Sequence, residues 1–234
     1  MFFDYYYILW VLPAVIFAIW ASTKVSTTFQ KYSAQLSHLG LSGSQAARKV
    51  LDAFGVYQIK IEKIGGSLTD HYDPRTNIIR LSGSVCDRTS IAAIGVAAHE
   101  AGHAIQYAQG YLPIKIRHAI IPVTNIGSRL AIPLILIGLL FAGEGGGLGN
   151  LAYLGVLCFG LSTLFQLITL PVEFDASRRA LRALESTHIL TGEELYGARK
   201  VLTAAALTYV AALAVSLTQL FRLLAIVNRR NGRR

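Results

Sequence analysis

The most informative stretch of this chain is Ser90-Ile-Ala-Ala-Ile-Gly-Val-Ala-Ala-His-Glu-Ala-Gly-His-Ala-Ile-Gln106. Its composition is typical of a helix, and the residues before His99 are almost all apolar. On a helix, positions i and i+4 lie above one another on the same face. The stretch therefore predicts a largely buried helix on which the side chains of His99 and His103 lie next to each other.

The pattern His99-Glu100-x-x-His103 is typical of a zinc site. Two imidazoles at this spacing can share one Zn²⁺, and Glu100 on the adjoining face can reach a water activated by the metal. A chance pair of histidines at a polar surface is the alternative. The apolar flank argues against it, because buried imidazoles and a buried carboxylate need partners, which a metal supplies. Such a site requires a third protein ligand and an open fourth position, and it supports hydrolysis.

Glu173 is the expected third ligand. It stands near the start of Pro171-Val-Glu-Phe-Asp, directly after an apolar run. A carboxylate there is costly unless it faces water, pairs with a charge or binds a metal. With Glu173 the ligand set becomes two histidines and a glutamate, as in thermolysin. The alternatives are that Glu173 complements a helix dipole, or that His71 and Asp70 approach the site. The remaining histidines are interpreted as surface or interfacial residues: His38, His118 and His188.

The composition indicates a membrane protein. Of 234 residues, 53% are hydrophobic and only 15% are charged, and the mean hydropathy is +0.47. This is too apolar for a soluble domain of this size. The net charge of +9 is not taken as a sign of nucleic-acid binding, because the basic residues are dispersed or flank apolar runs. Cys86 and Cys158 lie in unrelated contexts, so we expect free thiols and a reducing compartment.

Four apolar runs cover residues 5–20, 120–141, 148–170 and 201–221. About 20 apolar residues are needed to cross a bilayer. Aromatic residues stand at both ends of the first run, and no basic segment precedes it, so we interpret it as an uncleaved anchor. The segments expected along the chain are an N-terminal transmembrane anchor (1–21), a catalytic α+β segment (22–117), a transmembrane helical hairpin (118–170), a third-ligand helix segment (171–200) and a fourth apolar helix with a basic tail (201–234).

Lysine and arginine residues predict the orientation in the membrane. They flank the helix with the two histidines and fill the segment between the third and fourth runs, whereas the glycine-rich turn at residues 142–150 has none. Positive residues favour the cytoplasmic side, so we expect a multi-pass protein of the cytoplasmic membrane with its site facing the cytoplasm. The basic tail from Arg229 to Arg234 disagrees with this rule, which leaves open whether the fourth run crosses fully.

The segment before the metal helix is expected to be an α+β domain. Residues 44–54 predict a short amphipathic helix with Ser42 or Ser44 as its N-cap and Gly55 at its C-terminal end. Apolar and polar residues alternate over residues 56–64, which is typical of a strand.

A hairpin is expected next, formed by residues 66–72 and 76–82 around the turn Asp73-Pro74-Arg75. We expect these strands to form a small antiparallel sheet that leads into the metal helix. Residues 77–81 are a candidate edge strand that pairs with an extended peptide substrate. The alternative is a hairpin that only supports the helix.

Several stretches resemble the YugP-like neutral zinc metallopeptidases, and the similarity covers nearly the whole chain. They are Gly65-Gly-Ser-Leu-Thr-Asp-His-Tyr-Asp-Pro-Arg75, Val96-Ala-Ala-His-Glu-Ala-Gly-His-Ala-Ile-Gln106, Glu173-Phe-Asp-Ala-Ser-Arg-Arg-Ala180 and Val201-Leu-Thr-Ala-Ala-Ala-Leu-Thr-Tyr-Val210. The chain is also distantly similar to the HtpX and CAAX prenyl protease group. There the third-ligand motif reads Glu-Phe-x-Ala-Asp, and the resemblance implies that its Asp braces a ligand histidine. Here Ser177 replaces that Asp, and Asp175 is a candidate substitute although it points elsewhere along a helix.

Together these features predict a mainly α membrane protein with four apolar helices and a small α+β zinc-metalloprotease domain. The expected activity is that of a membrane-embedded zinc metalloendopeptidase acting on protein or peptide substrates, and the resemblance suggests membrane protein quality control. His99, His103 and Glu173 are expected to hold Zn²⁺, and Glu100 is the expected general base. The alternative is a zinc-binding membrane scaffold without turnover. The candidates for stabilising the oxyanion are Tyr209, His71, Arg178 and Arg179, and the sequence does not choose between them.

Overall fold

The protein is described by a computed structural model that covers residues 4–141 and 149–231. The glycine-rich turn expected at residues 142–150 lies outside the described residues except for its last two positions. The chain divides into two compact units. One comprises Met1–Trp20, Ile116–Leu170 and Tyr209–Arg234, and the other comprises Ala21–Lys115 and Pro171–Thr208. We call them the apolar unit and the catalytic unit.

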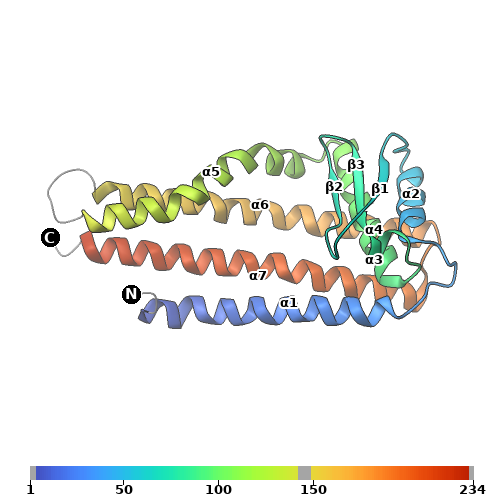
Figure 1. Ribbon diagram of the computed structural model, residues 1–234, viewed down its shortest axis with the longest axis horizontal. Helices are drawn as coiled ribbons and strands as arrows, with labels where there is room; N and C mark the ends of the chain where they lie inside the picture. Colours follow the sequence, from blue (N-terminus) through green and yellow to red (C-terminus); the bar gives the residue numbers. More distant parts are fainter. Residues whose placement is uncertain (1–3, 142–148, 232–234) are drawn as a thin grey trace. The chain divides into compact units, whose positions relative to one another are not determined.

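Four long helices account for the four apolar runs (Figure 1). They are α1 (Leu12–Ser33), which continues a π-helical turn over Tyr7–Val11, α5 (Leu112–Leu140), α6 (Asn150–Ser186) and α7 (Gly192–Asn231). Each is long and apolar enough to cross a membrane. The chain is therefore a mainly α membrane protein, as predicted. The fourth apolar run continues in both directions as a helix, because neither Gly nor Pro interrupts residues 198–231.

Small residues let helices approach closely in the apolar unit. A Cβ atom added to Gly138 would lie 2.1 Å from the Ala152 amide nitrogen, and one added to Gly155 would lie 2.7 Å from the Ala131 carbonyl oxygen. Such contacts between α5 and α6 are typical of helix packing in lipid. The hydroxyls of Thr163 on α6 and Ser216 on α7 are 2.7 Å apart and form an interhelical hydrogen bond. The two glycines therefore leave no room for a side chain of their own at these points, and the helices pack closely.

Helix α2 (Gly43–Ala53) begins where its capping residue predicts. The Ser42 hydroxyl accepts a hydrogen bond from the Gln45 amide, and the Gln45 side chain accepts one from the Ser42 amide, which forms a capping box. Of the two candidate caps, Ser42 rather than Ser44 is therefore the N-cap. Gly55 has a φ of +70°, the left-handed conformation that ends a helix and that glycine adopts without strain.

The three strands form a mixed sheet and not an antiparallel one. They are β1 (Lys60–Ile64), β2 (His71–Asp73) and β3 (Ile78–Ser82), in the order β1-β3-β2. The β2–β3 hairpin is antiparallel, as expected, but β1 pairs with β3 in parallel. The strands are also shorter than predicted. Leu68 and Asn77 have φ values of 56° and 55°, and residues in this left-handed conformation cannot continue a strand.

The edge-strand hypothesis for residues 77–81 is wrong. Strand β3, which contains most of this segment, is the central strand of the sheet, and its main-chain groups are already paired on both sides. Ile79 and Leu81 are completely buried, so one face of β3 lies in the core. The edges of the sheet are β1 and β2, and any peptide that extends the sheet has to pair with one of these two.

The hairpin contains a partly buried ion pair between Arg80 and Asp73, and its contribution to stability depends on pH. Arg80 donates a hydrogen bond of 2.9 Å to Asp73 and, with the Arg75 amide and the Thr76 hydroxyl, lowers the pKa of Asp73 to about 2. The unfolded value is about 3.9. Because the folded pKa is the lower one, the pair stabilises the protein above about pH 4, and this contribution is lost as the pH falls toward 2.

We therefore expect Asp73→Asn to lower the free energy of unfolding by about 1 kcal/mol at pH 7, after allowance for solvent screening. The difference between wild type and variant should vanish as the pH falls from 4 to 2. Thermal unfolding in detergent, followed by circular dichroism at several pH values, measures it. Glu62→Gln, an exposed change on β1, is the control. An Asp73→Asn deficit that persists at pH 2 would contradict the assignment.

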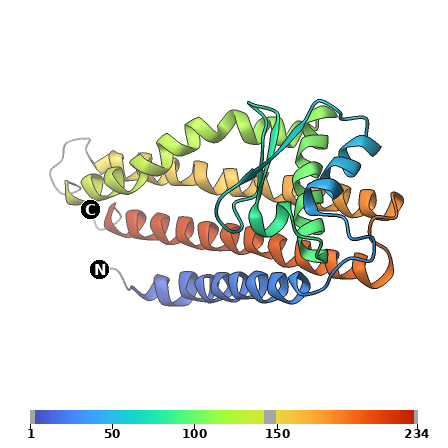
Figure 2. The ribbon, with the colours of Figure 1, turned by 45° about the vertical axis from the view of Figure 1, so that its right-hand side comes forward.

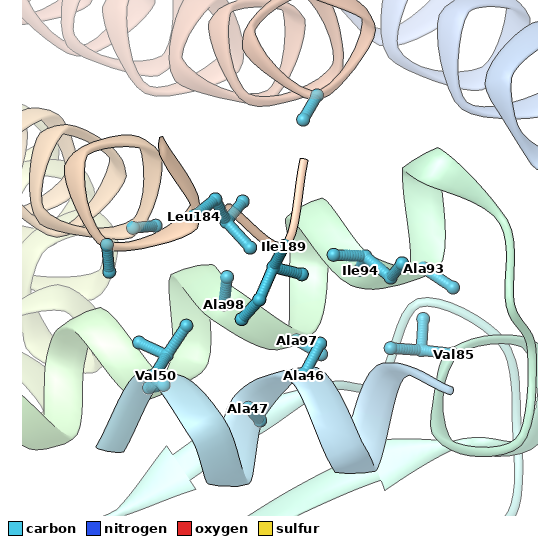
Figure 3. Close-up of a cluster of buried hydrophobic side chains, with 14 of the residues drawn as sticks. Ala46, Ala47, Val50, Val85, Ala93, Ile94, Ala97, Ala98, Leu184 and Ile189 are labelled. Carbon is cyan, nitrogen blue, oxygen red and sulfur yellow. The ribbon is translucent and has the colours of Figure 1, made fainter. Parts of the chain in front are cut away.

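Helix α4 (Ile91–Ala108) is the centre of the catalytic unit. Its N-cap Ser90 accepts a hydrogen bond from the Ala93 amide. The helix packs against α2 and against strands β2 and β3 (Figure 2). Figure 3 shows Ala97 and Ala98 of α4 in a cluster with α2 on one side and Leu184 and Ile189 on the other. Because this face of α4 consists mostly of alanines, the neighbouring segments pack close to the helix. This packing fixes the position of the helical turn that carries His99 and His103.

Candidate metal centre

Two helices of the catalytic unit bring the predicted ligands together. Helix α4 carries His99 and His103, one turn apart, with ring centroids separated by 4.7 Å. Helix α6 carries Glu173. Ligand atoms of the three residues all lie within 4.8 Å of one another, and among the described residues they form the group of histidine, cysteine and acidic side chains suited to hold a metal. Glu100 is not part of this group.

The separations of the ligand atoms fit a tetrahedral zinc ion. Glu173 Oε2 is 3.3 Å from His99 Nε2 and 3.5 Å from His103 Nε2. Zinc binds nitrogen and oxygen ligands at about 2.0–2.2 Å, and tetrahedral angles then place two ligand atoms about 3.4 Å apart. Both imidazoles present Nε2 to the carboxylate and turn Nδ1 away. Both separations between the carboxylate and the imidazoles therefore match those of a tetrahedral site.

The three ligand candidates are largely removed from water. Glu173 is 1% exposed and His103 is 8% exposed. The Glu173 carboxylate faces both imidazoles, and a divalent cation between these groups would supply the positive charge that favours a buried carboxylate. The dipole interpretation of Glu173 is wrong, because α6 begins at Asn150 and Glu173 lies deep inside it.

The other sequence candidate for the third ligand is engaged elsewhere. The Asp70 carboxylate accepts hydrogen bonds from the amide and the hydroxyl of Ser82, the amide bond being 2.7 Å long. The exposed His71 ring forms a 2.8 Å hydrogen bond between Nδ1 and the Thr69 carbonyl oxygen. Both residues therefore stabilise the hairpin and its connection to β3.

Glu100 lies on α4 between the two histidines and is 8% exposed. Burial raises the pKa of its carboxyl to about 7, although the neighbouring His99 acts in the opposite direction. A carboxyl group with a pKa near neutrality both accepts and releases a proton under physiological conditions. Its position and proton affinity thus suit acid–base chemistry beside the metal.

Each histidine is held through its second ring nitrogen. Ser177 Oγ is 3.1 Å from His99 Nδ1, and Gln106 Oε1 is 3.0 Å from His103 Nδ1. The amide oxygen accepts from Nδ1–H, and this leaves the lone pair of Nε2 free for a metal. Ser177 therefore braces His99 from the ring nitrogen that does not face Glu173.

Gln106 connects the two helices of the site. It is completely buried, and its side-chain amide donates to the Val172 carbonyl at 2.8 Å and to the Asp175 carboxylate at 2.9 Å. Asp175 in turn pairs with Arg179 at 2.5 Å. Asp175 thus supports His103 indirectly, through an amide. The sequence analysis did not find Gln106, although a polar residue three positions after His103 on an apolar helix is a detectable signal.

The contacts of the candidate oxyanion donors distinguish the two neighbouring arginines. Arg179 is engaged by Asp175 and by the Gln109 side chain. Arg178, one residue earlier, points into a separate cavity that Ser177 also lines. Tyr209 belongs to the apolar unit. Of the two neighbouring arginines, Arg178 is therefore the one without a carboxylate partner among the described residues.

Gly102 sets the distance between the two ligand-bearing helices. A Cβ atom at this position would lie 2.6 Å from the Ala176 carbonyl oxygen of α6, too close for any side chain. We expect Gly102→Ala to move the helices apart, to destabilise the protein by about 1–3 kcal/mol and to weaken zinc binding about tenfold. Zinc affinity by chelator competition and thermal unfolding measure both effects.

Gly95→Ala on the same helix is the matched control. Its added Cβ would meet the Ala198 side chain at 3.4 Å, an ordinary contact, and alanine favours the helix. Equal zinc affinity in the Gly102→Ala variant and wild type would show that the helix spacing does not control the site.

The chain matches the family described as "putative neutral zinc metallopeptidase" over residues 7–228. It therefore belongs to this family of zinc peptidases, and Zn²⁺ is its cofactor. Among curated proteins it is similar to the "putative membrane protease YugP" of Bacillus subtilis (strain 168). The two are 44% identical over 220 residues, which cover 94% of this chain and 96% of the relative. No solved structure matches the chain significantly.

Proposed function

We propose that this chain is a membrane zinc metalloendopeptidase in which His99, His103 and Glu173 hold the metal and Glu100 is the general base. The observation that carries the proposal is the pair of Nε2–Oε2 separations of 3.3 and 3.5 Å between α4 and α6, which match a tetrahedral site. The ligand set of two histidines and a glutamate is that of the thermolysin type. Membership in a zinc peptidase family supports it.

When bound, Zn²⁺ supplies Lewis-acid polarisation of the scissile carbonyl and lowers the pKa of a water molecule. Glu100 accepts a proton from that water while the oxygen of the water attacks the carbonyl carbon. Glu100 then gives the proton to the amine that leaves, so the carboxylate is regenerated. Ser177 and Gln106 keep both imidazoles in place through Nδ1.

The proposed orientation places the metal centre at the cytoplasmic face of the membrane. Lys24, Lys115 and Arg117 follow or precede apolar runs next to the catalytic unit, and such residues favour the cytoplasmic side. The catalytic part would then consist of residues 22–117 and 171–200, anchored by the remaining helices. The name of the relative, a "putative membrane protease", supports protein substrates at the membrane, and the role that we propose there is quality control of membrane proteins.

The experiment that tests the proposal is proteolysis by the purified full-length chain in detergent. Fluorescently labelled casein, an unfolded substrate, is incubated with protein of measured zinc content, before and after treatment with a chelator. We expect internal cleavage that disappears with the metal and returns when one equivalent of Zn²⁺ is added. Mass spectrometry of the products distinguishes an endopeptidase from an exopeptidase.

A zinc-binding membrane scaffold is the competing hypothesis. It predicts a full equivalent of bound zinc but no cleavage of unfolded soluble or membrane proteins under any of these conditions. That result would overturn the proposed function.

A further inference from the structure

A cavity of about 470 Å³ lies beside the metal centre, between α6 and α7 within the catalytic unit. Its apolar lining includes Leu181, Leu202 and Ala206. Three exposed arginines, Arg178, Arg182 and Arg199, also line it. The lining of the cavity therefore combines aliphatic side chains with three positively charged guanidinium groups.

The three arginines are not neutralised. Within the part of the chain that the structure describes, no carboxylate lies within 4.0 Å of their guanidinium groups, and Glu185 is the acidic residue among those that line the cavity. In contrast, the neighbouring Arg179 pairs with Asp175. Guanidinium groups without a carboxylate partner bind carboxylates well when they line a cavity, because two of their N–H groups can donate to the two carboxylate oxygens at once.

The cavity borders the metal centre at Ser177, and His99, His103 and Glu173 themselves do not line it. Ser177 lines the cavity, and its hydroxyl is 3.1 Å from His99 Nδ1. Arg178 and Arg182 follow Glu173 by five and nine residues on the same helix. With a rise of about 1.5 Å per residue, they lie about 7.5 and 13.5 Å farther along α6 than the glutamate.

We propose that this cavity is a substrate subsite for an acidic side chain, so that the enzyme prefers peptides with Glu or Asp near the scissile bond. The inference rests on the proposed function. An extended peptide advances about 3.3 Å per residue. A carboxylate held by Arg178 or Arg182 therefore belongs to a residue two to four positions from the bond that is cleaved. The aliphatic lining accommodates the methylene groups of that side chain.

The first test uses a library of peptides derived from digested cell proteins. After incubation with the full-length enzyme, mass spectrometry locates the new termini, and we expect Glu and Asp to be enriched two to four residues from the cuts. A pair of fluorogenic peptides that differ by Glu and Gln at the enriched position then gives the preference. We expect about a tenfold higher kcat/KM for the Glu peptide, mainly through KM, and a smaller ratio at high salt.

Charge reversal assigns the preference to the cavity. Arg182→Glu should remove the preference for Glu and favour a peptide with Lys at that position, and Arg178→Gln should reduce the ratio toward one. Arg88→Gln, an exposed arginine that does not line the cavity, should keep the ratio of wild type. Binding of the same peptides to the Glu100→Gln protein, measured by fluorescence anisotropy, reports the preference without turnover.

The failure of this inference is separate from failure of the proposed function. Cleavage and binding that do not distinguish Glu from Gln peptides would overturn the subsite while the peptidase stands. If the Arg variants leave the peptide ratio unchanged but lose binding to vesicles of phosphatidylglycerol relative to phosphatidylcholine, the cavity serves a lipid phosphate, and the subsite is likewise overturned. Absence of any cleavage by zinc-loaded wild type would contradict the proposed function itself.

Discussion

Glu100→Gln is expected to reduce peptide hydrolysis by at least 10²–10⁴-fold, the usual contribution of a general base, and to leave zinc binding intact. The amide is nearly the same size as the carboxyl group, so the packing around this buried residue on α4 is preserved. It cannot accept a proton from water, and the group of ligand candidates does not include Glu100. Catalysis and metal binding should therefore separate in this variant.

Casein cleavage and zinc content, measured on the same preparation, test this expectation. Glu62→Gln, the same chemical change at an exposed position of β1, should have wild-type activity. Turnover by Glu100→Gln at the wild-type rate would contradict the role of Glu100 as the base. Loss of zinc together with activity would instead make Glu100 part of the metal site.

Glu173→Ala is expected to have the largest effect on zinc binding. It removes the carboxylate of the ligand set and leaves only the two imidazoles, so zinc affinity should fall by more than the 10–100-fold that is typical for the loss of a bracing contact. Gln106→Ala should fall within that 10–100-fold range, because His103 keeps its place on α4 but loses the acceptor at Nδ1. Competition with a chromophoric chelator gives both affinities.

Gln109→Ala is the control for Gln106→Ala. Gln109 is exposed and contacts only the far end of the same network, at Arg179. Wild-type affinity in the Gln106→Ala variant would show that the buried amide has no part in positioning His103. Wild-type affinity in Glu173→Ala would remove Glu173 from the ligand set.

Local signals in the sequence were sufficient for α2 and for the histidine face of α4, but not for the third-ligand segment, which continues α6 instead of starting a new helix at Pro171. Ser42 and Gly55 define the ends of α2 because capping depends on a few neighbouring residues. The positions of His99 and His103 on one face of α4 follow from helix periodicity in the same way. Glu173 was recognised because an acidic residue beside an apolar run requires an explanation.

The arrangement of the sheet could not be predicted from such signals. Ile79 and Leu81 of β3 are buried and alternate with partly exposed residues, but a central strand and an edge strand can show the same pattern. The parallel pairing of β1 with β3 depends on the path of the connecting chain. Gln106 was missed for a related reason, since its partners on α6 are 66 and 69 residues away in sequence.

The buried amide of Gln106 has a consequence for how the protein acquires its metal. Its hydrogen bonds to α6 and to His103 involve only groups of the chain, and they join α4 to α6 without using any of the proposed ligand atoms. Little conformational entropy then has to be lost when zinc enters, in contrast to small domains that fold only around their metal. We therefore expect the chain to be able to fold and insert before zinc arrives, so that zinc supply controls activity more than folding.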